Sequence, residues 1–188
     1  VNSTALTDST RFVNWTGLGV GNYSYNVTVN DSAGNTNYTG TRTIDLMNIA
    51  QGCRNIVWKG AYTLVNSTIV NYPSTCMVID TSDVYFDGQG YTIDGVNTGN
   101  GIHVVGSSGN ELTNVTINNT FVNDFATGLY FEYTDNSFVF DSNFSSGNSR
   151  NIRILYSNNN IFNNLNITDA SGSNDQGLEL AAADFNNI

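Results

Sequence analysis

A repeat of about 25 residues constrains this chain more than any other feature of its sequence. Short runs of alternating apolar residues each begin at a Cys, Gly or Asn, and their first residues are Cys76, Gly101, Gly128, Asn151 and Gly177. Successive first residues are therefore 25, 27, 23 and 26 positions apart. A period of this length indicates a repeat architecture in which each unit stacks on the next one.

Each repeat contains three short β-prone runs and no helical period. In one unit, Cys76–Asp80 is followed by Val84–Phe86 and then by Tyr91–Ile93. Three strands per turn of about 25 residues is the pattern of a right-handed parallel β-helix. The sequence therefore predicts an all-β fold in which residues 49–188 form this solenoid.

The glycine-rich stretch Asp87–Gly95, written DGQGYTIDG, allows two interpretations. A phosphate-binding loop leads from a strand into a helix, and no helical pattern follows Gly95. In the solenoid, Gly88, Gly90 and Gly95 instead supply tight bends where a side chain would collide with the next coil. We favour the second interpretation.

The two cysteines, Cys53 and Cys76, are 23 residues apart, which is one coil of the repeat. Residues one coil apart are separated by about 4.8 Å, within the Cα range of roughly 4.4–6.8 Å that a disulfide needs. We therefore expect a disulfide between them and an oxidising compartment for the protein. The alternative is two free buried thiols.

Asparagines also recur at one place in the repeat, eight or nine residues after the coil starts. They are Asn110, Asn136, Asn160 and Asn186. Stacked amides of this kind can hydrogen-bond along a solenoid, and we expect a structural ladder.

The region from Ile49 onward resembles the pectate-lyase-like superfamily of β-helices. The resemblance is carried by Cys53, Gly60–Leu64, Cys76–Ile79 and Asp87–Gly95, and it is greatest to the NosD-like repeat proteins of archaeal cell surfaces. It implies the fold but does not single out a function, because such helices serve as lyases, hydrolases, adhesins and scaffolds.

Residues 1–48 have a different pattern. Tyr23–Val29 and Tyr38–Leu46 are predicted strands, and Asn30–Asn35 has the composition of a turn between them. The phrase Gly21–Asn35 resembles the last hairpin of immunoglobulin-like modules. Because such a sandwich needs about 100 residues, we expect only part of a module here.

The solenoid pattern stops at Asn186–Ile188 without a capping segment. We expect either a piece of a longer surface protein or ends that neighbouring subunits cover, which would give head-to-tail polymers.

Alternation within the first strand of each coil separates inward from outward side chains. The inward residues are expected to be Met77, Ile79, Ile102, Val104, Leu129, Phe131, Ile152, Ile154, Leu178 and Leu180. The polar residues expected on the outer surface are Asp80, His103, Tyr130, Glu132, Arg153 and Glu179. This stripe is a candidate glycan groove, with Tyr130 as the stacking platform.

Catalysis has weaker support in the stripe. The resemblance implies a calcium cluster with a basic residue for lyases, or closely placed aspartates for hydrolases, whereas Asp80, Glu132 and Glu179 lie on different coils. Arg153 is the only central base, and no complete catalytic constellation emerges. We therefore lean away from an enzyme and favour a solvated face. The alternatives are a polysaccharide lyase, a glycoside hydrolase and a carbohydrate-binding module that uses this face.

Metal binding has one candidate. A single histidine, His103, gives no support for a histidine-based metal site. The carboxylates of Asp83, Asp87 and Asp94 fall in one coil and form a candidate calcium site. The alternative is that they cap backbone amides in turns.

Composition points to an extracellular surface. The formal charge is −10 and Lys59 is the only lysine, which argues against nucleic acid as a partner, and no apolar run is long enough to cross a membrane. Candidate N-glycosylation sites are Asn2, Asn14, Asn22, Asn26, Asn30, Asn37, Asn66, Asn114, Asn118, Asn143 and Asn166. An Asn-rich chain produces some of these triplets by chance, so chance is the alternative. We expect a glycosylated structural or adhesive protein that binds copies of itself or other surface proteins.

Overall fold

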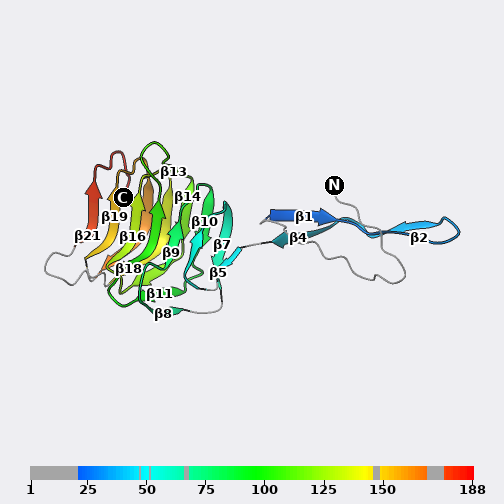
Figure 1. Ribbon diagram of the computed structural model, residues 1–188, viewed down its shortest axis with the longest axis horizontal. Helices are drawn as coiled ribbons and strands as arrows, with labels where there is room; N and C mark the ends of the chain where they lie inside the picture. The colour runs from blue at the N-terminus through cyan, green and yellow to red at the C-terminus, as the bar shows by residue number, and fades with distance from the viewer. Residues whose placement is uncertain (1–20, 47, 51, 66–67, 146–148, 169–175) are drawn as a thin grey trace. The chain divides into compact units, whose positions relative to one another are not determined.

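The computed structural model describes residues 21–46, 48–50, 52–65, 68–145, 149–168 and 176–188. The regular elements in these ranges are all β-strands. The chain divides into two compact units, Val1–Leu46 and Met47–Ile188 (Figure 1).

The described part of the first unit is a long antiparallel hairpin. Its outer pair is β1 (Gly21–Tyr25) with β4 (Arg42–Leu46), and its inner pair is β2 (Thr28–Asn30) with β3 (Thr36–Tyr38). Between the two pairs, the Val27 N–H donates to Thr39 Oγ1 at 2.9 Å and the Thr39 N–H donates to Val27 O at 2.8 Å. The predicted strand–turn–strand pattern is therefore present, with one interruption in each arm.

Asp31 closes the turn of this hairpin. Its carboxylate accepts hydrogen bonds from the backbone N–H groups of Ala33 and Asn35, at 2.9 and 2.8 Å, and from the Asn35 amide at 2.7 Å. The Asn35 side-chain bond is the main reason that the pKa of Asp31 is lowered. This is the local turn chemistry that favours aspartate at the first position of a turn.

The second unit is a parallel β-helix of about five turns, as the repeat predicted. One face, called the first face below, is a six-stranded parallel sheet. Its strands, in spatial order, are β6 (Arg54–Ile56), β9 (Met77–Ile79), β12 (Asn100–Val105), β16 (Thr127–Glu132), β19 (Arg150–Leu155) and β21 (Gln176–Ala181).

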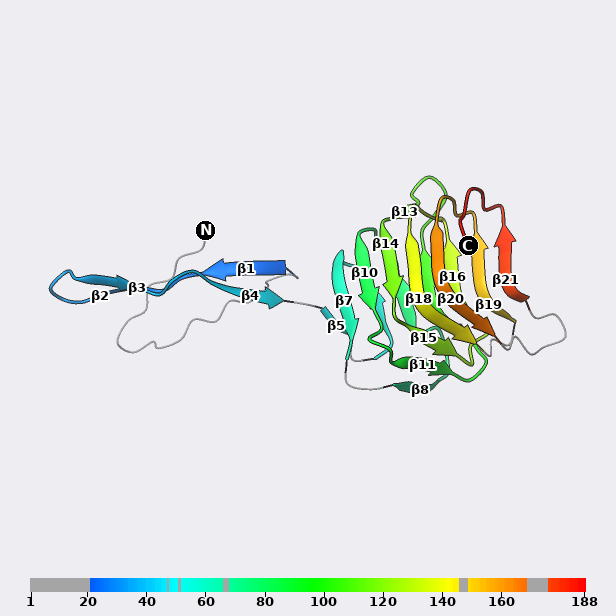
Figure 2. The ribbon, with the colours of Figure 1, turned by 180° about the vertical axis from the view of Figure 1, so that it is seen from behind.

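A nine-stranded sheet forms the rest of the wall (Figure 2). Its second face contains β5 (Asn48–Ala50), β7 (Gly60–Leu64), β10 (Val84–Asp87) and β14 (Val115–Asn118), and its third face contains β8 (Ile69–Tyr72), β11 (Thr92–Gly95) and β15 (Phe121–Asn123). Two long strands, β18 (Phe138–Ser145) and β20 (Ile161–Thr168), belong to both faces. A small pair, β13 (Leu112–Thr113) with β17 (Thr134–Asp135), lies at a corner.

The core is built from side chains stacked in register along the solenoid. One inward column runs through Ile56, Ile79, Val104, Phe131 and Ile154, and each of these residues is essentially fully buried. The predicted inward set is confirmed in the four coils from Met77 to Ile154. In the last coil Leu178 is half-buried, and Leu180 is 49 % exposed because β21 is the edge strand.

The corners of the coils use left-handed backbone, which explains why several asparagines lie there. One corner column contains Asp83, Asn114, Asn136, Asn159 and Phe185, all with φ between 48° and 60°. Asn and Asp adopt this conformation more readily than other non-glycine residues. The side chains also join coils, since Asn114 Nδ2 donates to Asp83 Oδ1 at 2.8 Å and Asn164 Nδ2 donates to Asp141 Oδ1 at 2.6 Å.

The stretch Asp87–Gly95 is a corner followed by a strand, as we predicted. A Cβ on Gly88 would lie 2.7 Å from the carbonyl oxygen of Asn119, and a Cβ on Gly95 would overlap Asp124 and Phe125 of the next coil. Gly90 is required for a different reason, because its φ is +72°. Strand β11 runs directly from the corner, so the geometry of a phosphate loop is not present.

The asparagine ladder is shorter than predicted. Asn160 is fully buried; its Oδ1 accepts from Ser137 N at 2.9 Å and its Nδ2 donates to Thr134 O at 2.8 Å. Asn186 repeats this arrangement one coil later, accepting from Asn160 N. The prediction was wrong for the other two residues: Asn136 is a left-handed corner residue and Asn110 lies in a loop opposite Ser107. Coil lengths differ, so counting from the coil start misplaces them.

Candidate functional site

The outer surface of the first face carries a column of polar and aromatic side chains. Cα register places His103 opposite Tyr130, Tyr130 opposite Arg153, and Arg153 opposite Glu179, on β12, β16, β19 and β21. Glu132 lies two residues beyond Tyr130 on β16, on the same side of the sheet. We call these five residues the polar column. The spacing of the repeat was sufficient to predict them as neighbours.

Tyr130 is enclosed within the column. Its ring stacks on His103 with centroids 4.5 Å apart and an interplanar angle of 2°, and the guanidinium of Arg153 lies 5.0 Å from its centroid. His103 and Arg153 come from the strands on opposite sides of β16, so they cover opposite faces of the ring. Both faces of the Tyr130 ring are therefore covered, and it cannot act as the predicted stacking platform unless one neighbour moves.

His103 and Glu132 form a polar contact beside the ring stack. His103 Nε2 lies 3.2 Å from Glu132 Oε2. Partial burial lowers the pKa of His103, and the opposing effect of the Glu132 carboxylate is smaller. Burial also raises the pKa of Tyr130, and the nearby Glu132 charge raises it further. At neutral pH the imidazole and the phenol are thus both uncharged.

Glu179 ends the column and contacts two arginines. Arg153 Nε lies 3.0 Å from Glu179 Oε2, and Arg150 Nε contacts the same oxygen. Neither contact is a hydrogen bond, and both are ion pairs. Sequence reasoning missed Arg150 because it lies just before the apolar run that begins at Asn151. The remaining predicted stripe residue, Asp80, is exposed beyond the end of β9.

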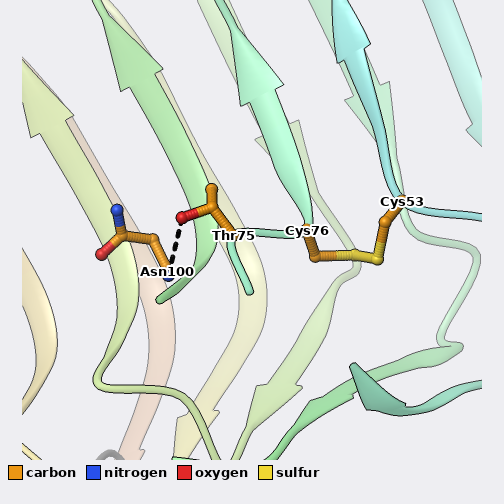
Figure 3. Close-up of a disulfide and its surroundings, with 4 residues drawn as sticks. All are labelled: Cys53, Thr75, Cys76 and Asn100. Carbon is orange, nitrogen blue, oxygen red and sulfur yellow. Dashed lines mark hydrogen bonds between the residues drawn. A yellow bond between two sulfur atoms is a disulfide. The ribbon is translucent and has the colours of Figure 1, made fainter. Parts of the chain in front are cut away.

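The disulfide is present as predicted. Cys53 and Cys76 are bonded with a Cα–Cα distance of 4.4 Å, and they lie at the starts of β6 and β9 (Figure 3). The next rung of the same corner is held by hydrogen bonds: Asn100 N donates to Thr75 Oγ1 at 3.1 Å and Cys76 N donates to Asn100 O at 2.9 Å. The disulfide therefore joins the first coil to the second, and at the same corner hydrogen bonds join the second coil to the third.

The three calcium candidates are engaged in corner hydrogen bonds. Asp83 accepts from the Asn114 amide, Asp94 Oδ1 accepts from Asn123 Nδ2 at 2.5 Å, and Asp87 Oδ1 accepts from Gln89 N at 2.8 Å. Within the described ranges, no group of three or more His, Cys, Asp or Glu side chains is arranged to hold a metal ion.

The glycosylation candidates fall into distinct environments. Asn26, Asn30, Asn37, Asn114 and Asn166 are exposed, whereas Asn118 and Asn143 are half-buried. The Nδ2 atoms of two of them already donate hydrogen bonds, from Asn114 to Asp83 and from Asn118 to Tyr85. The side chain of Asn22, on β1, and the residues Asn2, Asn14 and Asn66 lie outside the described part of the chain.

Comparisons with protein-family models, with curated proteins and with solved structures find no significant match for this chain. Among the described residues, no helix is long and apolar enough to cross a membrane.

Proposed function

We propose that this chain is an extracellular structural or adhesive surface protein in which the β-helix is a rigid spacer. The observation that carries the proposal is the Cys53–Cys76 disulfide, because structural disulfides persist in oxidising compartments and are rare in the cytosol. In this proposal residues 1–48 are part of an immunoglobulin-like module and the helix belongs to the pectate-lyase-like superfamily, close to archaeal surface repeat proteins.

The side chains of the polar column support a structural role. Each of them contacts another member or Arg150: His103 contacts Tyr130 and Glu132, and Arg153 contacts Tyr130 and Glu179. A surface whose charged and aromatic groups are already paired gains less from binding a ligand than one whose groups are free. The column therefore extends the stacking of the coils to the outside of the sheet.

Glycosylation is the second part of the proposal. An N-glycan is attached through Nδ2, so a sequon whose Nδ2 is exposed and free of hydrogen bonds is the better acceptor. Among the described sequons, Asn26, Asn30, Asn37 and Asn166 are exposed and none of them donates an amide hydrogen bond to another described residue. We expect these four to be occupied before Asn114 and Asn118.

Self-association is the third part. The last coil exposes Leu180 at 49 %, Phe185 at 86 % and Ile188 at 54 %, and β21 is the edge strand of its sheet. Exposed apolar side chains beside an unpaired strand favour pairing with another β-structure. We infer that a second copy stacks its first coil on this surface.

Surface labelling of intact cells tests the location. Lys59 is exposed, so a membrane-impermeant amine reagent is expected to modify it on intact cells that produce the protein. Peptide mass spectrometry locates the label, and a Lys59→Arg variant is the matched control. Labelling of Lys59 only after lysis would contradict an extracellular location.

A polysaccharide lyase or hydrolase is the second candidate, because His103, Tyr130 and Glu132 contact one another beside Arg153. Such a cluster could transfer protons at a sugar ring. An assay against a polysaccharide panel, with Glu132→Gln and Arg153→Lys as variants, decides it. Turnover that both variants abolish would replace the structural proposal, and no turnover by the unmodified protein would remove the enzyme.

A further inference from the structure

The third face contains a groove that the polar column does not explain. It has a volume of about 330 Å³ and is lined by Phe121, Asp141, Ser142, Asn143, Asn164, Leu165 and Asn166. These residues come from β15, β18 and β20, where the two long strands bend at Asp141 and Asn164. The groove is open to solvent, so a ligand would lie against the sheet rather than be enclosed by it.

Amide pairing along the coils is incomplete in this groove: Asn164 pairs with Asp141, but the neighbouring pair of asparagines does not pair. Elsewhere neighbouring coils are joined by side-chain amides, as in Asn114 with Asp83 and Asn123 with Asp94. Asn143 and Asn166 are directly opposite in the Cα register, yet neither side chain hydrogen-bonds to the other among the described residues. The Oδ1 atom of Asn143 is buried and has no hydrogen-bond partner within the described part of the chain.

An unpartnered buried amide oxygen is costly, and a donor from outside the described chain reaches it once the Asn143 side chain turns toward the groove. The adjacent rung of the same column is Phe121, which pairs with Asn143 in register and is 39 % exposed. The groove thus combines an apolar ring with amides that both donate and accept. Asp141 is its single charged side chain, and one of its oxygens accepts from Asn164.

We propose that this groove is a binding site for a neutral saccharide. The C–H face of a sugar would lie on Phe121, and its hydroxyl groups would bond to Asn166 and to Asn143, whose side chain would turn its Oδ1 toward a hydroxyl donor. The low charge of the lining excludes a preference for strongly acidic or basic ligands. The saccharide has two sources: a free glycan, or the chain's own glycan attached at Asn166, whose sequon ends at Thr168.

Binding of a free glycan in this groove does not depend on the proposed extracellular function. Binding of the chain's own glycan, attached at Asn166, rests on that function. The test uses the full chain, ¹⁵N-labelled and produced without glycosylation, titrated with cellobiose, mannobiose and N,N′-diacetylchitobiose. We expect one of them to shift the amide signals of Asn143 and Asn166 with millimolar affinity.

Phe121→Ala and Phe138→Ala are matched variants, because Phe121 and Phe138 are 39 % and 38 % exposed on neighbouring faces of the same sheet. Phe121→Ala is expected to weaken binding about tenfold, as expected when one aromatic contact is lost. Phe138→Ala should leave it unchanged, and unchanged spectra elsewhere show that both variants fold. Equal binding by both variants would overturn the assignment.

Native material distinguishes the two sources. If Asn166 carries a glycan and the disaccharide binds the Thr168→Ala variant but not the native protein, the attached glycan is the occupant. If the native protein binds the disaccharide equally well, the occupant is free. If no disaccharide shifts these signals and native Asn166 is unmodified, the proposal fails, while the disulfide and Lys59 labelling still decide the location.

Discussion

At the scale of single residues, the close approach of coils decides which positions tolerate a side chain. Gly88 illustrates this, because an added Cβ would be 2.7 Å from Asn119 O and 2.8 Å from Thr120 Cα, and Thr120 is fully buried. The backbone of the next coil cannot move away without breaking its hydrogen bond from Gly88 N to Asn118 O.

Gly88→Ala is therefore expected to lower the free energy of unfolding by about 1–3 kcal/mol, the usual cost of overpacking. Gly52→Ala is the matched control, since a Cβ there meets nothing within 4 Å. Urea unfolding followed by circular dichroism measures both variants. Equal midpoints for the two would show that the coils are less closely stacked than described.

His103 gives a prediction about pH. Burial lowers its pKa in the folded protein below the usual value of 6.5, so the unfolded chain binds the proton more tightly. The free energy of unfolding should therefore fall as pH decreases from about 7 through 6.5 and below. A His103→Phe variant keeps a ring against Tyr130 but does not titrate.

The difference in stability between the His103→Phe variant and the unmodified protein should therefore change between pH 7.5 and 5.5, in the variant's favour at the lower pH. Urea unfolding at both values measures this change. Parallel losses of stability in the two proteins would mean that His103 is not the titrating group.

At the scale of elements, much of the structure follows from period and alternation. Runs such as Met77–Ile79 recur once per coil with inward apolar residues, so strand positions, the disulfide and the neighbours in the polar column could all be predicted. The bends within β18 and β20 could not, because Asp141 and Asn164 look like ordinary polar residues within continuous runs.

The groove could not be predicted from the sequence because it depends on these bends. They place Phe121, Asn143 and Asn166 around one groove, a constellation spread over 46 positions from 121 to 166. The stacking around Tyr130 could not be predicted from the sequence either. The register shows that His103 and Arg153 are neighbours of Tyr130, but not that their side chains contact its ring.

The disulfide is the element that joins the first two coils. It closes a loop of 23 residues, for which the chain-entropy model gives about 3 kcal/mol of stabilisation. The Cys53→Ala/Cys76→Ala double variant should lose roughly this amount in urea unfolding. Reduction of the unmodified protein should produce a comparable loss, and the double variant should not respond to reductant. Unchanged stability in both experiments would contradict a structural role.

At the scale of the whole molecule, the exposed last coil predicts association. The average mass measured by light scattering should rise with protein concentration, and a Leu180→Ser/Phe185→Ser variant should remain monomeric because the apolar contact is lost. Val96→Ser, which changes an exposed valine in a turn away from the last coil, is the control. A constant monomer mass for the unmodified protein would contradict self-association.

The central claim is that a disulfide-linked, glycosylated β-helix lies outside the cell. Peptide mass spectrometry of native protein, digested without reduction, tests it most directly. The account predicts a linked pair of peptides containing Cys53 and Cys76, together with glycans on exposed sequons such as Asn26, Asn30 and Asn37. Free thiols at both cysteines and unmodified asparagines at these positions would contradict it.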